Sequence, residues 1–293
     1  MHYHAIDMAD GALPFTVLMQ GRFTADRVRV IHDSRERPTT PQLDALIEAE
    51  WLPRLADAQR DGRLLFNGEL LRYVGHRIID GPRGMAEQES QFELMVGPTC
   101  YRDFVGTNLY NNRRVAEFGW KSFSNPVGTT ATLLTADGRI CYGRRSMQVA
   151  FHAGYVHTFG GALEPGDRDA TGAVDVFDSV RRELHEEVGV RPNELESLIC
   201  VGLIRDTEIL QPELLFEAHV PLTTAELIQR WAGAEARNEH HELVDLPDDS
   251  DAIVPFIHSC GKIAPVAVGG LMLHGLYRWG QGWYDRAEAE LMR

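Results

Sequence analysis

The stretch from residue 182 to residue 190, Arg-Glu-Leu-His-Glu-Glu-Val-Gly-Val, constrains this chain more than any other. Read as a helix, it places Glu183, Glu186 and Glu187 at positions i, i+3 and i+4, so three carboxylates share one face. Like charges at this spacing repel one another unless a cation neutralises them. Mg²⁺ suits such a group, because it is a hard ion that binds carboxylates, keeps several waters and bridges to phosphates. The spacing therefore predicts a magnesium site, and a solvated acidic face is the alternative.

The residues around the acidic stretch fit a helix that packs one face on a core. Asp175 suits the N-cap position, and Gly189 suits the left-handed residue that follows a helix. Arg182 lies beside the acids and is able to hold a carboxylate through paired hydrogen bonds. Apolar residues recur at helical spacing on the other face, at Val176, Phe177, Val180, Leu184 and Val188.

The pattern Arg-Glu-aliphatic-x-Glu-Glu-x-Gly-aliphatic resembles the second half of the Nudix box, which marks hydrolases of nucleoside diphosphates linked to another moiety. Residues 160–167, Gly-Gly-Ala-Leu-Glu-Pro-Gly-Asp, resemble the first half. The family box has a glycine, five residues, a glutamate, and seven residues before the Arg-Glu pair. Here Asp167 replaces that glutamate, and fourteen residues (168–181) precede Arg182, so seven are extra. The roles of Asp167 and of the insertion stay open.

A second motif, Tyr-Arg-Asp-Phe-Val-Gly-Thr-Asn at residues 101–108, closely resembles a segment of the UDP-glucose pyrophosphatase branch of the Nudix hydrolases. Without the resemblance, its spacing indicates only a capped helix start with packed aromatic rings. The segment 33–38, Asp-Ser-Arg-Glu-Arg-Pro, is similar to the N-terminal region of that branch, and residues 144–150 are similar to the strand before its box. That branch also has an insertion before the catalytic helix, although in animals it departs from the arginine found here at position 182.

The hydrophobic pattern predicts an α+β protein in two parts. Residues 1–125 form an N-terminal α+β unit, either an independent domain or a cap on the site. Residues 126–293 form a Nudix domain, for which the resemblance implies an α/β/α sandwich. In the first part we expect a helix at 41–60 and strands at 14–19, 27–31, 64–66, 70–74 and 92–96. In the second part we expect a hairpin at 129–143, strands at 156–159, 198–204 and 213–220, helices at 175–189 and 223–232, and a packed C-terminal helix that contains the apolar stretches 253–258 and 264–279.

Composition narrows the class of protein. Among the 293 residues, 44% are hydrophobic and 25% are charged, as in ordinary globular proteins. The formal net charge of −14 argues against binding to nucleic acid or a membrane surface, which favour basic proteins. The chain shows no apolar run of 18 residues, no signal-peptide pattern and no CxxC pair among its four cysteines. We therefore expect a cytoplasmic protein without a membrane span, zinc site or disulfide framework.

The leading hypothesis is a Mg²⁺-dependent pyrophosphohydrolase, with Mn²⁺ as a substitute ion. The residues themselves predict metal-assisted hydrolysis of a diphosphate. The resemblance implies the substrate, UDP-glucose or a similar UDP-hexose, and the products, UMP and the sugar 1-phosphate. The expected catalytic residues are Arg182, Glu183, Glu186 and Glu187, of which the three glutamates bind the metal. The expected substrate-binding residues are Tyr101, Arg102, Asp103, Thr107, Asn108, Arg144, Arg145, Gly160 and Gly161.

Several alternatives remain open. One rival is a Nudix hydrolase for ADP-ribose, NADH or coenzyme A, and another is a non-catalytic module that binds a nucleotide sugar. The general base is either a helix glutamate or a nearby loop acid. Arg205 and Asp206 fit a strand end as well as a site role. Histidines such as His152, His157 and His185 show no metal-ligand spacing, so we expect them to be structural or exposed.

Overall fold

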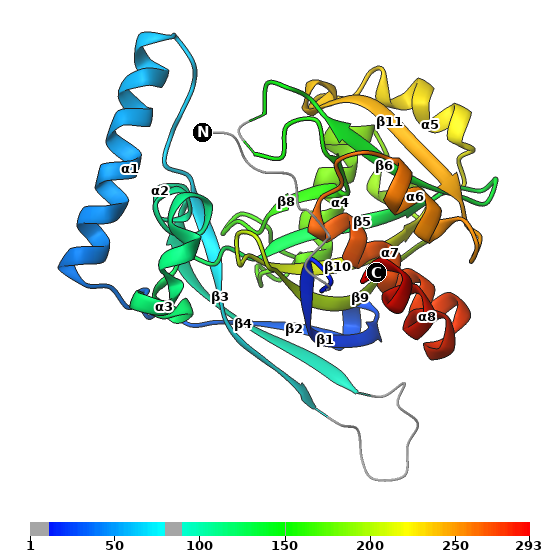
Figure 1. The fold of residues 1–293 in the computed structure, drawn as a ribbon, viewed down its shortest axis with the longest axis horizontal. Coiled ribbons are helices and arrows are strands. Elements are labelled where there is room, and N and C mark those ends of the chain that lie inside the picture. The colour runs from blue at the N-terminus through cyan, green and yellow to red at the C-terminus, as the bar shows by residue number, and fades with distance from the viewer. Residues whose placement is uncertain (1–11, 80–89, 150) are drawn as a thin grey trace.

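In the computed structural model, which describes residues 12–79, 90–149 and 151–293, one large sheet lies between two layers of helices (Figure 1). Its strands follow the path β1-β9-β10-β5-β6-β11, with β7 beside β6 and β8 beside β5. The β10–β5 pair is parallel, and the other pairs are antiparallel. The strands are β1 (Phe15–Phe23), β5 (Gly128–Leu134), β6 (Arg139–Arg145), β7 (Val156–His157), β8 (Phe159–Ala162), β9 (Ser197–Asp206), β10 (Pro212–His219) and β11 (His240–Pro247).

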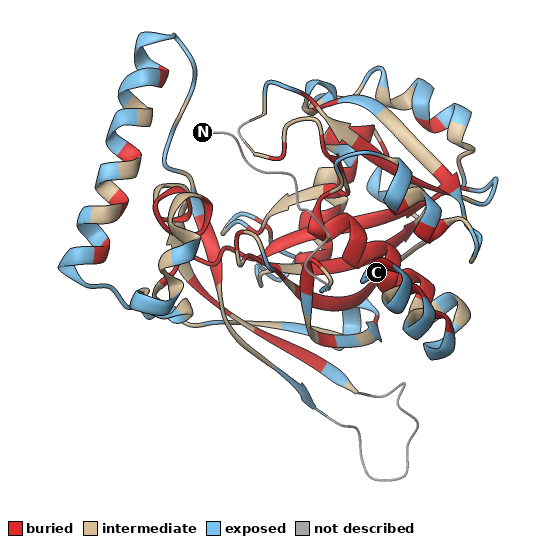
Figure 2. Ribbon diagram, viewed as in Figure 1, coloured by how far each residue is buried: buried red, intermediate tan, exposed pale blue. Residues whose placement is uncertain are grey.

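Helices cover both faces of the large sheet. Successive side chains of β10 point to opposite faces of the sheet. Leu214 and Phe216 belong to the core under α4, whereas Leu215 belongs to the core under α7. Buried residues concentrate in this sheet and in α7 (Figure 2). The covering helices are α4 (Val176–Val188), α5 (Thr224–Trp231), α6 (Ile253–Ser259), α7 (Pro265–Trp279) and α8 (Gln281–Leu291). The predicted α+β class and the α/β/α sandwich are confirmed.

A second, three-stranded sheet with the order β2-β4-β3 belongs to the N-terminal part of the chain. It consists of β2 (Val28–His32), β3 (Glu69–Ile79) and β4 (Gln91–Cys100). The strand predicted at 14–19 corresponds to β1, which pairs with β9 and therefore belongs to the large sheet instead of the three-stranded one. The strand predicted at 64–66 is wrong, since Leu64 and Phe66 are 88% and 65% exposed and residues 64–66 pair with no strand in the described part of the chain.

Helix α1 (Pro41–Arg60) packs on the segment that follows β4. That segment comprises α2 (Tyr101–Phe104), a π-helical turn (Val105–Leu109), short 3₁₀ turns and α3 (Val115–Phe118). A Cβ on Gly106 would lie 2.6 Å from the Ile47 Cα, so only glycine permits this approach. Trp51 of α1 joins Phe104 and Ile209 in a small separate core. The N-terminal unit is thereby attached to the loop that connects β9 and β10.

The predicted helices at 41–60, 175–189 and 223–232 are confirmed to within two residues at each end, whereas the predicted C-terminal helix is divided into two helices, α6 and α7. Strand β11 and helix α8 were not predicted. Among the described residues, no helix combines the length and the apolar character needed to cross a membrane.

A buried ion cluster links α7 to the large sheet. His274 contacts Glu217 Oε1 through Nδ1 and Asp248 Oδ1 through Nε2, both at 2.9 Å. The two carboxylates raise the pKa of His274 to about 9 against the opposing effect of burial. Arg22 pairs with Glu217 at 2.9 Å, and Arg278 lies 3.6 Å from Asp248. Hydrogen bonds to His274 lower the pKa values of both carboxylates.

This cluster makes stability depend on pH. The pKa of His274 is raised on folding, so its contribution is complete below about pH 6.5, the unfolded value, and is lost as pH rises through about 9. We expect His274→Gln to lower the unfolding free energy at pH 6.5 by roughly 3 kcal/mol, since it leaves buried carboxylates unpaired. The difference from wild type should shrink by pH 9.5, as measured by urea unfolding at both values. A constant difference would contradict the charged state of His274.

Candidate active site

The acidic helix forms where the sequence predicted it, as α4. The Asp175 side chain caps its N-terminus by accepting a hydrogen bond from the Phe177 amide at 2.8 Å. Gly189 ends the helix with a φ of 70°, a left-handed conformation that favours glycine. The five apolar residues predicted to face the core are all buried. The capping and packing therefore fix which side of the helix carries the glutamates.

Two consecutive glycines bring strand β8 against these glutamates. The Gly160 amide donates a hydrogen bond to Glu187 Oε2 at 3.0 Å. A Cβ on Gly161 would overlap Glu183 Oε1, so a side chain at this position would displace that carboxylate. The absence of a side chain on Gly161 allows β8 to lie directly on the acidic face of α4, whereas a Cβ on Gly160 would meet the Thr129 carbonyl and Thr130 of β5.

Arg182 compensates part of the negative charge. Its Nε donates to Asp167 Oδ1 at 3.0 Å, while its Nη1 lies 2.8 Å from Glu183 Oε1 and 3.4 Å from Glu186 Oε2. Asp167 is buried and also accepts a hydrogen bond from the Glu164 amide at 2.8 Å. The aspartate that replaces the family's first glutamate thus orients the arginine that precedes the three glutamates.

The insertion in the box forms a closed turn. The amide of Asp175 donates to the carbonyl of Asp167 at 3.0 Å, so the chain returns to its starting point after residues 168–174. Within the turn, the Asp169 side chain accepts hydrogen bonds from the amides of Thr171 and Ala173. The seven extra residues therefore project from the site without separating the two halves of the box.

The carboxylates on α4 lie in an unfavourable environment for charge. Burial and the neighbouring Glu187 raise the pKa of Glu183 to about 8, although the Arg182 charge opposes this shift. Burial, followed by repulsion from Glu239, raises the pKa of Glu187 well above its usual value. Within the described part of the chain, no three His, Cys, Asp or Glu side chains already converge as a metal site. Arg182 engages two of the glutamates, and the Gly160 amide engages the third.

A pocket of about 170 Å³ adjoins the acidic helix, because Gly160 and Gly161 contact the glutamates and also line the pocket. Other lining residues come from α2, β5, β6, the 151–162 segment, α7, and the end of β9 and start of β10 with the connection between them. Among them are Phe104, Thr130, Arg145, Phe151, His152, His157, Asp206, Ile209, Gln211, Glu213 and Val266. We call this cavity the active-site pocket.

The structure separates the two arginines that were predicted to bind substrate. Arg145 lines the active-site pocket and donates from Nε to the Phe151 carbonyl at 3.2 Å. The Arg144 side chain points to the opposite side of β6, where it donates hydrogen bonds to the Cys260 carbonyl at 3.2 Å and to Glu242 at 2.9 Å. Consecutive strand residues point to opposite sides, which explains the difference. Ala150, at the end of the motif that begins with Arg144, lies outside the described residues.

The predicted substrate-binding residues of the second motif lie behind the pocket. These residues are Tyr101, Arg102, Asp103, Thr107 and Asn108. None of them is among the described residues that line the pocket, although their neighbour Phe104 is. Asn108 is fully buried and donates to the Ile209 carbonyl and to Asn125 Oδ1, both at 2.9 Å. Asp103 forms an ion pair of 2.8 Å with Arg37. In this structure the motif holds the N-terminal unit against the β9–β10 loop.

Two buried acids were not singled out as site residues. Burial raises the pKa of Asp206 to about 7, although Oδ1 accepts hydrogen bonds from the amides of Ile209 and Glu208. Burial also raises the pKa of Glu213 well above its usual value. Asp206 was noted only as a strand end, and Arg205 beside it points away, over the Trp120 ring at 5.3 Å. The sequence signal for Asp206 was its position as an acid at the end of an apolar strand. No comparable signal in the sequence pointed to Glu213.

The histidines near the pocket behave as neutral side chains. Burial lowers the pKa of His152 to about 3 and that of His157 well below its usual value. His240 Nε2 lies 3.6 Å from Glu187 Oε1, and burial lowers the pKa of this histidine to about 4. His185 is exposed on α4.

The chain is similar to curated proteins of one family. It is 28% identical over 261 residues to uridine diphosphate glucose pyrophosphatase NUDT22 of Bos taurus, which covers 82% of this chain and 87% of that protein. It is 27% identical over 234 residues to Nudix hydrolase 9 of Arabidopsis thaliana, which covers 69% of this chain and 71% of that protein. A MutT protein from Methanosarcina mazei aligns with a TM-score of 0.34 and 16% identity, covering 52% of this chain and 94% of that one. No family model matches the chain.

The α/β/α sandwich, the split box and the glycine pair beside the acidic helix are those of a Nudix fold. With these relatives, the chain belongs to the Nudix hydrolase superfamily. It is an enzyme of the Nudix pyrophosphatase type.

The ion pairs of Arg182 yield a stability prediction. Arg182→Met leaves buried Asp167 without its cation, so we expect unfolding to become easier by roughly 2 kcal/mol, given that the arginine is partly exposed. Arg181→Met is the matched control, because Arg181 is about as exposed as Arg182 but makes only a long ion pair of 3.8 Å with Asp175 and a contact with the Phe177 ring. We expect this variant to lose about 0.5 kcal/mol or less. Thermal unfolding of the three proteins compares them. Equal losses for both variants would show that Arg182 does not hold the box together.

Proposed function

We propose that this enzyme hydrolyses UDP-glucose or a similar UDP-hexose to UMP and the sugar 1-phosphate, with Mg²⁺ as cofactor. One observation carries the proposal, namely that Glu187 and Glu183 of α4 lie against the backbone of Gly160 and Gly161, with Glu186 on the same face of the helix. Like charges would not be gathered in a partly buried place without a compensating cation. The only cation that contacts them in the described structure is Arg182.

The residues fit a hard divalent cation by their donor chemistry. Glu183, Glu186 and Glu187 supply carboxylate oxygens, the ligands that Mg²⁺ prefers, and Mn²⁺ accepts the same set. Gly161 leaves the space beside Glu183 that a Cβ would fill. When bound, such an ion polarises the phosphate oxygens and lowers the pKa of a coordinated water.

The chain's own residues perform the positioning that phosphoryl transfer requires. The backbone of Gly160 and Gly161 lets a diphosphate approach closely, because no Cβ intervenes. Arg145 lines the pocket beside them and provides a positive charge for a phosphate, by the paired contacts that a guanidinium makes. Asp206, with a pKa of about 7, lies in the same pocket and is a second acid able to accept a proton, alongside the helix glutamates.

The choice of a UDP-sugar is supported by the relatives. The animal proteins named uridine diphosphate glucose pyrophosphatase match at 24–31% identity. The motif at residues 101–108, which resembles that branch, packs directly behind the active-site pocket in this chain. A small-molecule nucleotide sugar also suits the pocket, because Arg145 places a cation in its described lining within a chain of net charge −14.

The division of labour between the two parts of the chain follows from this site. We propose that residues 1–125 act as a cap on the Nudix domain, residues 126–293, with Phe104 as their contribution to the pocket wall. Residues 1–11 and 80–89 lie outside the described part of this unit. Strand β1 is the exception to the division, since it belongs to the large sheet.

A substrate panel decides between the proposal and its rivals. UDP-glucose, ADP-ribose, NADH and coenzyme A are incubated with the enzyme and Mg²⁺, and the products are identified by mass. Preference for an adenine compound would reject the UDP-sugar assignment while keeping the Nudix reaction. Tight UDP-glucose binding in a single-turnover assay without any product would instead indicate a binding module.

The role of the acidic helix is tested by Glu187→Gln. We expect kcat to fall by a factor of about 10³ or more, since a removed metal ligand costs several kcal/mol of transition-state stabilisation. His185→Gln on the same helix is the control and should keep wild-type turnover, because His185 is exposed. Thermal unfolding confirms that both variants fold. Wild-type turnover in Glu187→Gln would refute the site assignment.

The glycine beside Glu183 gives a second test. Gly161→Ala should lower kcat at least about 100-fold, the scale of a displacement of roughly 1 Å in an active site. Folding should persist, because the overlapping atom is the end of a flexible side chain. Gly166→Ala is the control, since a Cβ there meets nothing within 4 Å. Equal activity of both alanine variants would show that the close approach of β8 is not needed for catalysis.

A further inference from the structure

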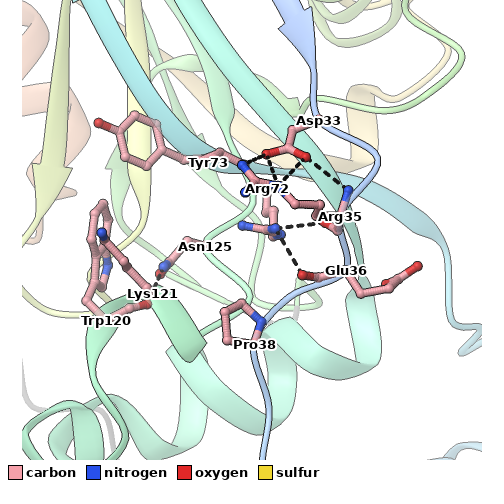
Figure 3. A pocket seen from close by; sticks show the side chains of 10 residues that line it. Asp33, Arg35, Glu36, Pro38, Arg72, Tyr73, Trp120, Lys121 and Asn125 are labelled. Atoms are coloured by element: carbon pink, nitrogen blue, oxygen red, sulfur yellow. Dashed lines mark hydrogen bonds and ion pairs between the residues drawn. The ribbon is translucent and has the colours of Figure 1, made fainter.

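A second cavity, of about 430 Å³, lies where the N-terminal unit meets the start of the Nudix domain (Figure 3). It shares no described lining residue with the active-site pocket. Its walls come from the segment before α1, from β3 and from the 120–125 segment. The lining residues are Asp33, Arg35, Glu36, Pro38, Arg72, Tyr73, Val74, Trp120, Lys121 and Asn125. We call it the Arg72 pocket.

Arg72 is a buried cation without an ion partner. Arg72 is only 7% exposed, and its Nη2 donates hydrogen bonds to the carbonyls of Arg35 and Glu36 at 2.9 and 3.3 Å. Its Nε is buried and has no hydrogen-bond partner. Among the described residues, no carboxylate forms an ion pair with this guanidinium. Burial of an unpaired charge costs several kcal/mol, which an anionic ligand would offset.

The acids in the wall, Asp33 and Glu36, attract Arg72 through space but form no ion pair with it among the described contacts. Asp33 is engaged by Arg35, whose Nη2 lies 2.6 Å from Oδ2 and whose Nε bonds both carboxylate oxygens. The Glu36 carboxylate points away from Arg72, as Figure 3 shows. Lys121 adds a second cation to the lining, and it is exposed. The described lining therefore has more cationic side chains (Arg35, Arg72 and Lys121) than acidic ones (Asp33 and Glu36), in a protein that is acidic as a whole.

The same pocket contains aromatic surface. The rings of Tyr73 and Trp120 are 5.4 Å apart, and Figure 3 shows both beside the cavity. The Trp120 indole is fixed, because its Nε1 donates to the Leu210 carbonyl at 3.0 Å and Arg205 lies over its ring. Aromatic side chains held in this way offer a surface on which a flat heterocycle packs.

We propose that the Arg72 pocket binds a mononucleotide, with the phosphate at Arg72 and Lys121 and the base against Trp120 and Tyr73. A volume of about 430 Å³ falls within the usual range of small-molecule sites. The proposal stands on the lining residues and not on the reaction of the active site. Trp120 bonds the loop that also carries Ile209 and Gln211 of the active-site pocket, so the two cavities share a wall element.

Calorimetric titration tests this site. UMP, AMP, uridine and inorganic phosphate are titrated into the full chain with EDTA present. We expect both nucleotides to bind at least tenfold more tightly than uridine or phosphate, because neither half alone uses the cations and the rings together. Lys121→Gln should weaken UMP about tenfold, equivalent to 1.4 kcal/mol. Because Lys121 is exposed, this variant retains the wild-type fold.

Matched variants complete the design. Arg72→Met should weaken UMP further than Lys121→Gln does, whereas Arg29→Met on β2 and Lys262→Gln should match wild type. Lys262 is the other lysine of the chain and lies near Tyr155, away from the pocket. Equal affinity for uridine and UMP, or for phosphate and UMP, would overturn the proposal. So would a UMP affinity that falls in Gly161→Ala but not in Lys121→Gln, and that result would leave the proposed hydrolysis standing.

Discussion

The contact between β8 and α4 is the constraint on which the rest of the site depends. A helix that carries three glutamates on one side is poorly stable alone, and burying those glutamates raises the cost further. The Gly160 amide and the Arg182 guanidinium engage the carboxylates without neutralising them completely. The raised pKa values of Glu183 and Glu187 indicate that their ionised forms are not fully compensated, which is the basis for proposing a divalent cation at this site.

The N-terminal unit contributes to this site through packing and backbone contacts. Gly106 lets α1 approach the π-helical turn, and Asn108 of that turn holds the Ile209 carbonyl. The β9–β10 loop is thereby fixed from outside the large sheet. The motif at residues 101–108 thus has a structural reason for its buried polar residues, since buried polar groups need partners.

The β9–β10 loop also relates the two cavities. Asp206 and Ile209 face the active-site pocket, while Arg205 and the Leu210 carbonyl contact Trp120 at the edge of the Arg72 pocket. Successive residues alternate in direction along the strand and its connection, so one short segment serves both sides. A nucleotide at Trp120 would contact a ring that is bonded to this loop.

The sequence by itself determined the local features. The acidic helix, its Asp175 cap, its Gly189 end and its buried face follow from spacing and residue chemistry, and all were predicted. The sandwich followed from the resemblance together with the apolar pattern. These features depend on neighbours within a few positions, which one sequence contains in full.

Only the tertiary structure decided which distant residues meet. In the structure Asp167 pairs with Arg182, and Asp206 and Glu213 line the active-site pocket. The side chains of Arg144 and Arg145 point to opposite sides of β6, and β1 belongs to the large sheet. The tertiary structure also placed the 101–108 side chains, apart from Phe104, outside the described lining of the active-site pocket. Such pairings depend on sheet register and on which face of a strand is buried, and a shift of one residue would reverse both. For that reason the spacing along the chain could not specify them.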